Sequence, residues 1–208
     1  MFVQLVYVLR CPRDRSELVV VADVTDDRQI VSGRLGCPIC REQYPIRDGA
    51  AYFEPAESPP AESPDGDHRS AEEEPALRIA ALLDLTDARG YAILCGDWGR
   101  HAPVIAGLSP TPLVLVNPPD GIDWRLGCSV IYSVHGSPFG ASSARALALS
   151  GARSESALLE AVAPGGRVLG PASLAVPAGL SVIARDETTW VAERVDRGQL
   201  VRMKRAGS

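Results

Sequence analysis

The sequence predicts a mixed α/β protein in which a small β ribbon precedes a doubly wound α/β domain. Three observations carry this prediction. Cysteines in short turns occupy the first quarter of the chain, an acidic proline-rich stretch follows, and strand-like apolar runs then alternate with helical ones. Such alternation is typical of a parallel sheet covered by helices. We expect a ribbon domain over 1–53, a linker over 54–75, the α/β domain over 76–195 and a basic tail over 196–208.

The ribbon is expected from two short motifs, CPRD at Cys11 to Asp14 and CPIC at Cys37 to Cys40, with 22 residues between them. Each motif is a tight turn, so the pair can place four ligands at the corners of a tetrahedron, as zinc requires. Three thiolates and one carboxylate form a harder site than four thiolates. The alternative is a ribbon that has lost its metal and is held by its apolar core. Since all four positions are filled by protein ligands, the expected role of zinc is structural.

The linker is expected from its charge and its prolines. The whole chain has 26 acidic and 21 basic residues, a net charge of −5, but residues 54–75 hold eight acids and one base. That stretch carries −7 and five of the 17 prolines, which leaves +2 for the rest. It has no aromatic residue and little apolar surface to bury, so we expect a semi-extended tether.

The α/β domain is read from its periodicity. A helix is expected from Leu77 to Leu85, with Pro75 at its first position, and further helices over 100–108 and 154–162. PGG at 164–166 is expected to end the last of these. Strands are expected over 91–95, 112–116, 129–134, 145–149, 167–169, 180–184 and 189–195.

Composition excludes several classes of protein. With 46% hydrophobic and 23% charged residues, the chain is neither disordered, collagen-like nor a basic nucleic-acid wrapper. No apolar run approaches the roughly 18 residues of a membrane span, and the apolar start lacks the flanks of a signal peptide. An odd number of cysteines with one CxxC pair favours a reducing compartment, so we expect a cytoplasmic protein.

The N-terminal segment resembles a known family. LVYVLRCPRDRSELVV and LGCPICREQYPIRDGAAYF are similar to small zinc-ribbon proteins that activate methyltransferases, and Tyr44 to Gly49 (YPIRDG) matches a stretch typical of the bacterial members. The resemblance covers about residues 4–53. It implies a ribbon that does no chemistry and binds a methyltransferase by strand addition or apolar contacts. Asp14 departs from the family pattern, which has cysteine there.

Residues 76–195 resemble a class I S-adenosylmethionine-dependent methyltransferase domain, a Rossmann-like fold, here trimmed. The similar stretches are SPFGASS at 137–143, LLEAVAPGGR at 158–167, and the closing hairpin with ARD at 184–186 and WVAER at 190–194. The resemblance implies cofactor contacts at Gly96, Gly99 and Asn117. Trp98 stands where the family has a glycine, Leu94 and Ala144-Arg145 replace expected acids, and Asn117 replaces the acid that binds the ribose. We therefore expect the fold to persist without S-adenosylmethionine.

One short motif and several single residues are further candidates, each with a structural alternative. Asn117-Pro118-Pro119 resembles the NPP-aromatic loop of amino-group methyltransferases, but Asp120 replaces the aromatic residue and a turn after a strand is the alternative. His101 and His135 are candidate bases or exposed loop residues. Cys95 and Cys128 are expected in the core, and Trp98, Trp124 and Trp190 in packing.

Three functions follow from these observations. The first is a non-catalytic assembly or regulatory subunit that binds another protein, such as a methyltransferase or a larger complex. The second is a working methyltransferase with an unusual cofactor site, activated by its own ribbon. The third is a nucleic-acid-binding module, which the ribbon does not favour because it has no basic cluster with interleaved aromatics.

Overall fold

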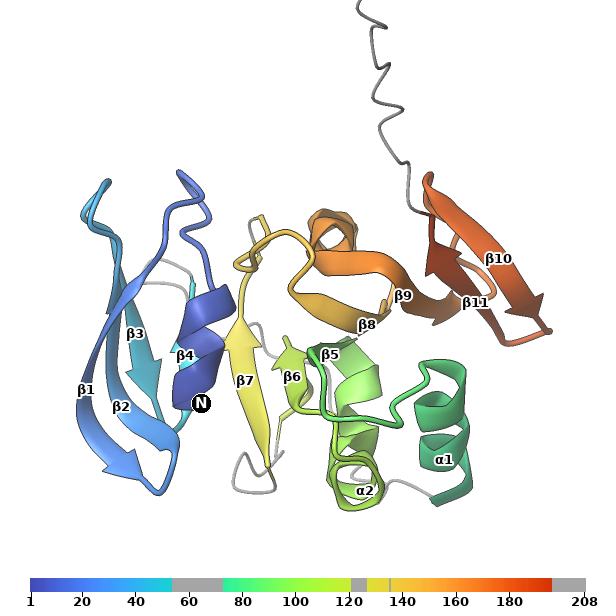
Figure 1. The fold of residues 1–208 in the computed structure, drawn as a ribbon, viewed down its shortest axis with the longest axis horizontal. Helices are drawn as coiled ribbons and strands as arrows, with labels where there is room; N and C mark the ends of the chain where they lie inside the picture. The colour runs from blue at the N-terminus through green and yellow to red at the C-terminus, as the bar shows by residue number, and fades with distance from the viewer. Residues whose placement is uncertain (54–72, 121–126, 135, 196–208) are drawn as a thin grey trace, which may run out of the picture.

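The computed structural model describes residues 1–53, 73–120, 127–134 and 136–195. Its centre is one sheet of eleven strands in the order β1-β2-β3-β4-β7-β6-β5-β8-β9-β11-β10 (Figure 1). The sheet runs through both parts of the protein. The linker segment 54–72, the tail 196–208, His135 and Trp124 lie outside the described residues.

The ribbon supplies the first four strands of the sheet. They form an antiparallel meander, because β1 pairs with β2, β2 with β3 and β3 with β4. Asp48 and Gly49 form the tight β3–β4 turn, both with positive φ, as in the turns that suit hairpins. A short 3₁₀ helix precedes the meander. The bounds are η1 Val3–Val8, β1 Val19–Asp26, β2 Gln29–Gly36, β3 Gln43–Arg47 and β4 Ala50–Tyr52.

The second part is a five-stranded parallel sheet closed by a hairpin. Strands β7, β6, β5, β8 and β9 run parallel, then β11 pairs antiparallel with β9 and β10 forms the edge. The bounds are α1 Glu73–Leu82, β5 Tyr91–Cys95, η2 Gly96–His101, α2 Ala102–Leu108, β6 Leu113–Val116, β7 Cys128–Tyr132, β8 Ala144–Ala148, η4 Arg153–Ala161, β9 Val162–Pro171, β10 Leu180–Arg185 and β11 Thr189–Arg194.

The two parts meet where β4 pairs in parallel with β7. Ala50, Ala51 and Tyr52 lie opposite Val130, Ile131 and Tyr132. Just after β4, the Phe53 amide donates to the Tyr132 carbonyl at 2.8 Å. The Tyr52 and Tyr132 rings stack with centroids 5.0 Å apart. The ribbon therefore extends the sheet of the second part by strand addition within one chain.

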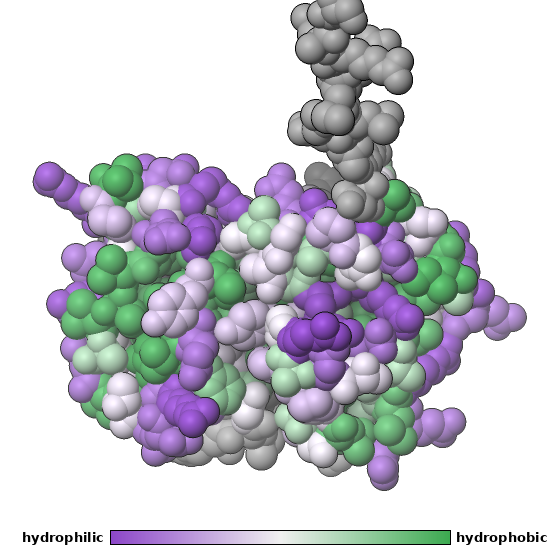
Figure 2. All heavy atoms as spheres, in the orientation of Figure 1, coloured by the Kyte–Doolittle hydropathy of each residue, from purple (hydrophilic) through white to green (hydrophobic). Residues whose placement is uncertain are grey.

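The core lies on both faces of the sheet. Residues alternate along β5, so Ala92 and Leu94 pack with α1 and α2, while Ile93 and Cys95 face the other way. On that second face the apolar residues of η4 and of the ribbon belong to one buried cluster, which includes Leu5 and Leu9. The N-terminal segment thus covers a face that a doubly wound domain ordinarily covers with helices. Figure 2 shows hydrophobic residues that still reach the surface over the ribbon.

The expected strands are found, with changes at two helices. Pro75 is the third residue of α1, not the first. The first N–H groups of a helix have no intrahelical acceptor, so the missing N–H of Pro75 removes no hydrogen bond from the helix. The expected helix over 154–162 is a 3₁₀ helix. PGG at 164–166 does not end it in a separate turn but lies inside β9, as an outward bulge between Val162 and Arg167, the partners of Ala144 and Ala146. None of the described helices is long and apolar enough to cross a membrane.

Candidate functional sites

Cys11, Asp14, Cys37 and Cys40 come together as the two CPxx motifs predict. Their ligand atoms all lie within 4.8 Å of one another. The Sγ atoms of Cys11 and Cys40 are 3.6 Å apart, and Cys37 Sγ lies 3.2 Å from Asp14 Oδ2. Three sulfurs and one carboxylate oxygen at such spacing are consistent with a zinc site.

The two turns that carry these ligands have matching backbones. The Arg15 amide donates to the Cys11 carbonyl at 2.9 Å, and the Arg41 amide donates to the Cys37 carbonyl at 3.0 Å. Arg15 and Arg41 have φ values of 65° and 64°. This left-handed conformation is uncommon for a residue other than glycine, and the same turn formed twice aims both ligand pairs at one point.

Asp14 is oriented by Ser16. The Ser16 amide and hydroxyl both donate to Asp14 Oδ1, at 3.0 and 2.6 Å. These hydrogen bonds, the hydroxyl first, hold the pKa of the Asp14 carboxyl well below its usual range. The carboxylate is therefore charged at neutral pH, and its other oxygen is turned toward Cys37. Sequence reasoning missed Ser16, although a serine two residues after a ligand acid is a common orienting pattern.

The expected cofactor turn follows β5, and the Trp98 side chain extends from this turn to the end of β8. Strand order reverses between β5 and β8, and ligands of such sheets bind outside the carboxyl ends of the strands at that reversal. Here Trp98 Nε1 donates to the Leu149 carbonyl at 2.8 Å, which joins the turn after β5 to the end of β8. A Cβ on Gly96 would lie 3.0 Å from the Ser150 side chain. Gly99 is buried in the same 3₁₀ turn.

A buried glutamate holds the residues that follow β8, next to the turn after β5. Glu155 is 5% exposed, and its carboxylate accepts the amides of Ser150 and Gly151 at 2.7 and 3.0 Å, together with the Ser150 hydroxyl. These three hydrogen bonds satisfy the acceptors of the buried carboxylate. Nothing in the spacing of the sequence marked Glu155, because its role depends on a turn that only the folded chain forms.

Asn117 follows β6, as expected for the residue at the ribose position. Its Nδ2 donates to the Ser133 carbonyl at 2.7 Å, and its Oδ1 accepts the Ser133 amide at 2.8 Å. Asn117 has φ 48°, which lets the amide fold back across to the end of β7. The side chain thus ties β6 to β7, and both of its polar atoms have protein partners.

The other candidates are resolved as follows. Cys95 and Cys128 are buried, as expected. His101 is half-buried at the end of η2 and is not an exposed loop residue. Burial, aided by the nearby Arg100 charge, lowers the pKa of His101, because both disfavour the imidazolium.

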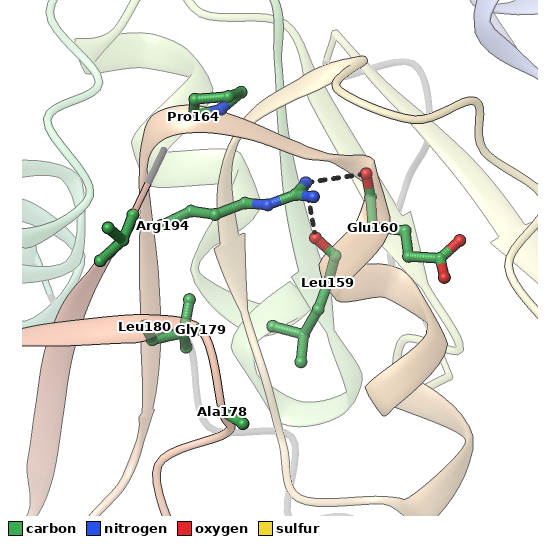
Figure 3. Close-up of a pocket in the computed structure, with 8 residues that line it drawn as sticks. Leu159, Glu160, Pro164, Ala178, Gly179, Leu180 and Arg194 are labelled. Carbon is green, nitrogen blue, oxygen red and sulfur yellow. Dashed lines mark hydrogen bonds between the residues drawn. The ribbon is translucent and has the colours of Figure 1, made fainter. Parts of the chain in front are cut away.

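A cavity of about 430 Å³ lies away from both sites, near the junction of η4 and β10. Its Arg194 guanidinium donates to the carbonyls of Leu159 and Glu160, at 3.1 and 3.0 Å (Figure 3). These carbonyls lie at the end of η4, where the Leu159 carbonyl also accepts the Val162 amide and the Glu160 carbonyl accepts the Ser142 amide at 3.0 Å. The arginine therefore caps a helix end, which is a structural role.

Comparison with known proteins places the N-terminal part. Residues 5–49 match the model of the Trm112p-like protein family, about a fifth of the chain. No curated protein matches the chain. Among solved structures, a methyltransferase from Geobacter sulfurreducens is similar at 11% identity with a TM-score of 0.39, over 59% of this chain and 77% of that one. The N-terminal region of this protein is therefore Trm112p-like.

Proposed function

We propose that this chain is a non-catalytic protein-binding subunit, built from a Trm112p-like ribbon and a methyltransferase-like domain that does not take S-adenosylmethionine. The Trp98–Leu149 hydrogen bond across the crevice is the observation that carries the proposal. An indole held there takes the space that a bound methionine moiety would need at the turn after β5.

The neighbouring positions support the same reading. The resemblance implies an acid after β6 that accepts hydrogen bonds from both ribose hydroxyls, but Asn117 is neutral and already bonded to the Ser133 backbone. The Ser150 side chain crowds Gly96, and Glu155 holds Ser150 in place. The polar atoms of Trp98, Asn117 and Ser150 are therefore already engaged within the protein.

Zinc is the metal we propose for the four-residue cluster, in a structural role. Cys11, Asp14, Cys37 and Cys40 would each supply one ligand, so no coordination position would be left for substrate. The metal would hold the two turns together, and no chemical step is assigned to it.

The ribbon also offers a surface suited to a protein partner. Val19, Val21 and Val24 of β1 are 59%, 44% and 53% exposed. They lie opposite Gly36, Arg34 and Ser32, alternate residues of β2, so the three valines share one face of the sheet. Three exposed apolar side chains on an edge strand favour contact with another protein.

One observation favours a second candidate, a methyltransferase activated by its own ribbon. The β4–β7 pairing gives this chain, within one polypeptide, a strand addition, which is one of the two modes of methyltransferase binding that the ribbon resemblance implies, the other being apolar contacts. The two candidates differ in their cofactor requirement.

Calorimetric titration with S-adenosylmethionine separates them. The proposal expects no binding at millimolar ligand, because the crevice is closed by Trp98 and Asn117. A dissociation constant in the micromolar range would contradict it and favour the second candidate.

Affinity capture from the source cells tests the protein-binding half. A protein retained by the wild-type chain is expected to be lost on Val21→Asp, while Asp23→Asn on the same strand retains it. Equal capture by both variants would contradict a role for this face.

A further inference from the structure

The turn that carries two of the metal ligands also contacts the second part of the protein. Arg10 precedes Cys11, and its amide donates to the Pro138 carbonyl at 2.8 Å. In the other direction, the Gly140 amide donates to the Val8 carbonyl at 2.7 Å. Leu9 and Phe139 lie opposite each other between these bonds as an antiparallel bridge. The segment Ser137–Gly140, which connects β7 to β8, thus pairs with the chain that enters the first metal turn.

Arg15 adds side-chain contacts to the same segment. It follows Asp14 directly, and its guanidinium donates to the carbonyls of Ser137 and Phe139, the latter at 2.7 Å. The Phe139 ring is 1% exposed and belongs to the core cluster that contains Leu5 and Leu9. The Arg15 guanidinium therefore bonds the main chain before Pro138 and after Phe139, whose ring is buried beneath the ribbon.

The direction of Arg15 depends on the metal turn. Its backbone is left-handed, a conformation that persists when surrounding contacts enforce it. Without metal, those contacts are the Arg15 amide bond to the Cys11 carbonyl, the Cys11 amide bond to the Ser16 carbonyl at 2.9 Å, and the Ser16 hydrogen bonds to Asp14. Bound metal would add a link between the two ligands Cys11 and Asp14. Without metal, nothing joins the Cys11 and Asp14 side chains through a common centre, and the turn loses that constraint.

We propose that metal binding docks the ribbon onto the segment Ser137–Gly140, with Arg15 as the positioning residue that transmits the state of the metal turn. The β4–β7 pairing is one attachment of the ribbon, and this segment is a second that depends on zinc. The inference rests on the metal cluster and stands whether or not the chain binds S-adenosylmethionine.

Amide hydrogen exchange of the full chain tests this inference. In the zinc-loaded protein the amides of Arg10 and Gly140 are expected to be protected. Removal of zinc by a chelator should speed their exchange by about tenfold or more. This is the effect expected from losing a charge-assisted hydrogen bond between the Arg15 guanidinium and the segment Ser137–Gly140. The amides of β5 serve as the internal reference, since they lie in the middle of the sheet.

Two arginine variants separate docking from stability of the ribbon. Arg15→Ala should keep about one zinc per chain but exchange faster at Gly140. Arg13→Ala is the matched control, because Arg13 lies on the same turn and its guanidinium, within the described part of the chain, donates to Glu42 of the ribbon at 2.8 Å. It should leave exchange at Gly140 unchanged.

Three results would overturn the proposal. The first is a purified protein that contains no zinc. The second is an exchange rate at the Arg10 and Gly140 amides that is the same with and without chelator. The third is an Arg15→Ala variant whose exchange rate at Gly140 equals that of Arg13→Ala. If chelation also speeds exchange of the β5 amides, the whole fold has loosened. The test is then the exchange rate at Gly140 in zinc-loaded wild-type and Arg15→Ala protein, because this comparison leaves the metal in place.

Discussion

Single side chains decide what the two candidate sites can do. At the metal cluster, Asp14 takes a position where the ribbon family has cysteine, and two hydrogen bonds from Ser16 orient it. At the turns after β5 and β6, the polar side-chain atoms of Trp98 and Asn117 form hydrogen bonds with the backbone of Leu149 and Ser133. Under the proposed function, Asp14 keeps a metal ligand, whereas Trp98 and Asn117 make contacts within the protein in place of cofactor contacts.

Changes at Asp14 should alter metal affinity in both directions. Asp14→Ala is expected to weaken zinc binding by about tenfold or more, since even residues that only orient a ligand have effects of that size. Asp14→Cys should tighten binding, because zinc favours a fourth thiolate. Competition with a chromogenic chelator measures both. Asp23→Ala, an acid of the same ribbon outside the cluster, is the control, and equal affinities in all variants would contradict the assignment.

Trp98 should contribute to stability through its indole N–H. Trp98→Phe keeps an aromatic ring but leaves the Leu149 carbonyl without its donor, at a cost of about 1 kcal/mol in the free energy of unfolding. Urea denaturation measures this difference. Tyr7→Phe, at an exposed side chain, should change nothing. An unchanged midpoint for Trp98→Phe would argue against the hydrogen bond.

His101 should make stability depend on pH. Its pKa is lower in the folded protein than its usual value of about 6.5, so the unfolded chain takes up its proton first as pH falls. The free energy of unfolding should therefore decrease as pH falls through that value. His101→Gln should remove this part of the slope in thermal melts between pH 8 and 5. An unaltered slope would show that His101 is not the group responsible.

At the scale of elements, local sequence patterns predict where strands lie better than they predict which strands pair. The strand over 91–95 is found with its expected bounds, because a continuous apolar run is typical of a strand buried on both faces. The prediction that PGG at 164–166 ends a helix is wrong, since a glycine turn and a bulge inside a strand have the same local sequence. The β4–β7 pairing joins residues about 80 positions apart, and no periodicity specifies such a partner.

The β4–β7 junction should depend on its main chain. Ala51→Pro removes a backbone donor from the middle of β4, and we expect a loss of about 2 kcal/mol in unfolding free energy together with release of the ribbon. Limited proteolysis and small-angle scattering would detect the separation. Ala51→Gly, which keeps the N–H, is the matched control. A compact Ala51→Pro protein would contradict the role given to this pairing.

At the scale of the whole molecule, the ribbon and the sheet form one continuous structure. The charge of −7 in residues 54–75 predicts a tether between two modules, and the domain boundaries at 53 and 76 remain a prediction. In the described residues, however, the modules share a sheet and a buried cluster. The metal cluster was predictable because its ligands lie in two short motifs. The contacts at the expected cofactor turn were predictable only in part, since those of Glu155 and Asn117 exist only in the fold.

The central claim is that the cofactor crevice is closed by the protein's own side chains. The indole N–H signal of Trp98 in a ¹⁵N-labelled sample, assigned with Trp98→Phe, reports on this directly. The account predicts that millimolar S-adenosylmethionine leaves this signal and the amides of Gly96 and Gly99 where they are. A saturable shift of these signals on titration would show that the crevice opens to the cofactor and would contradict the account.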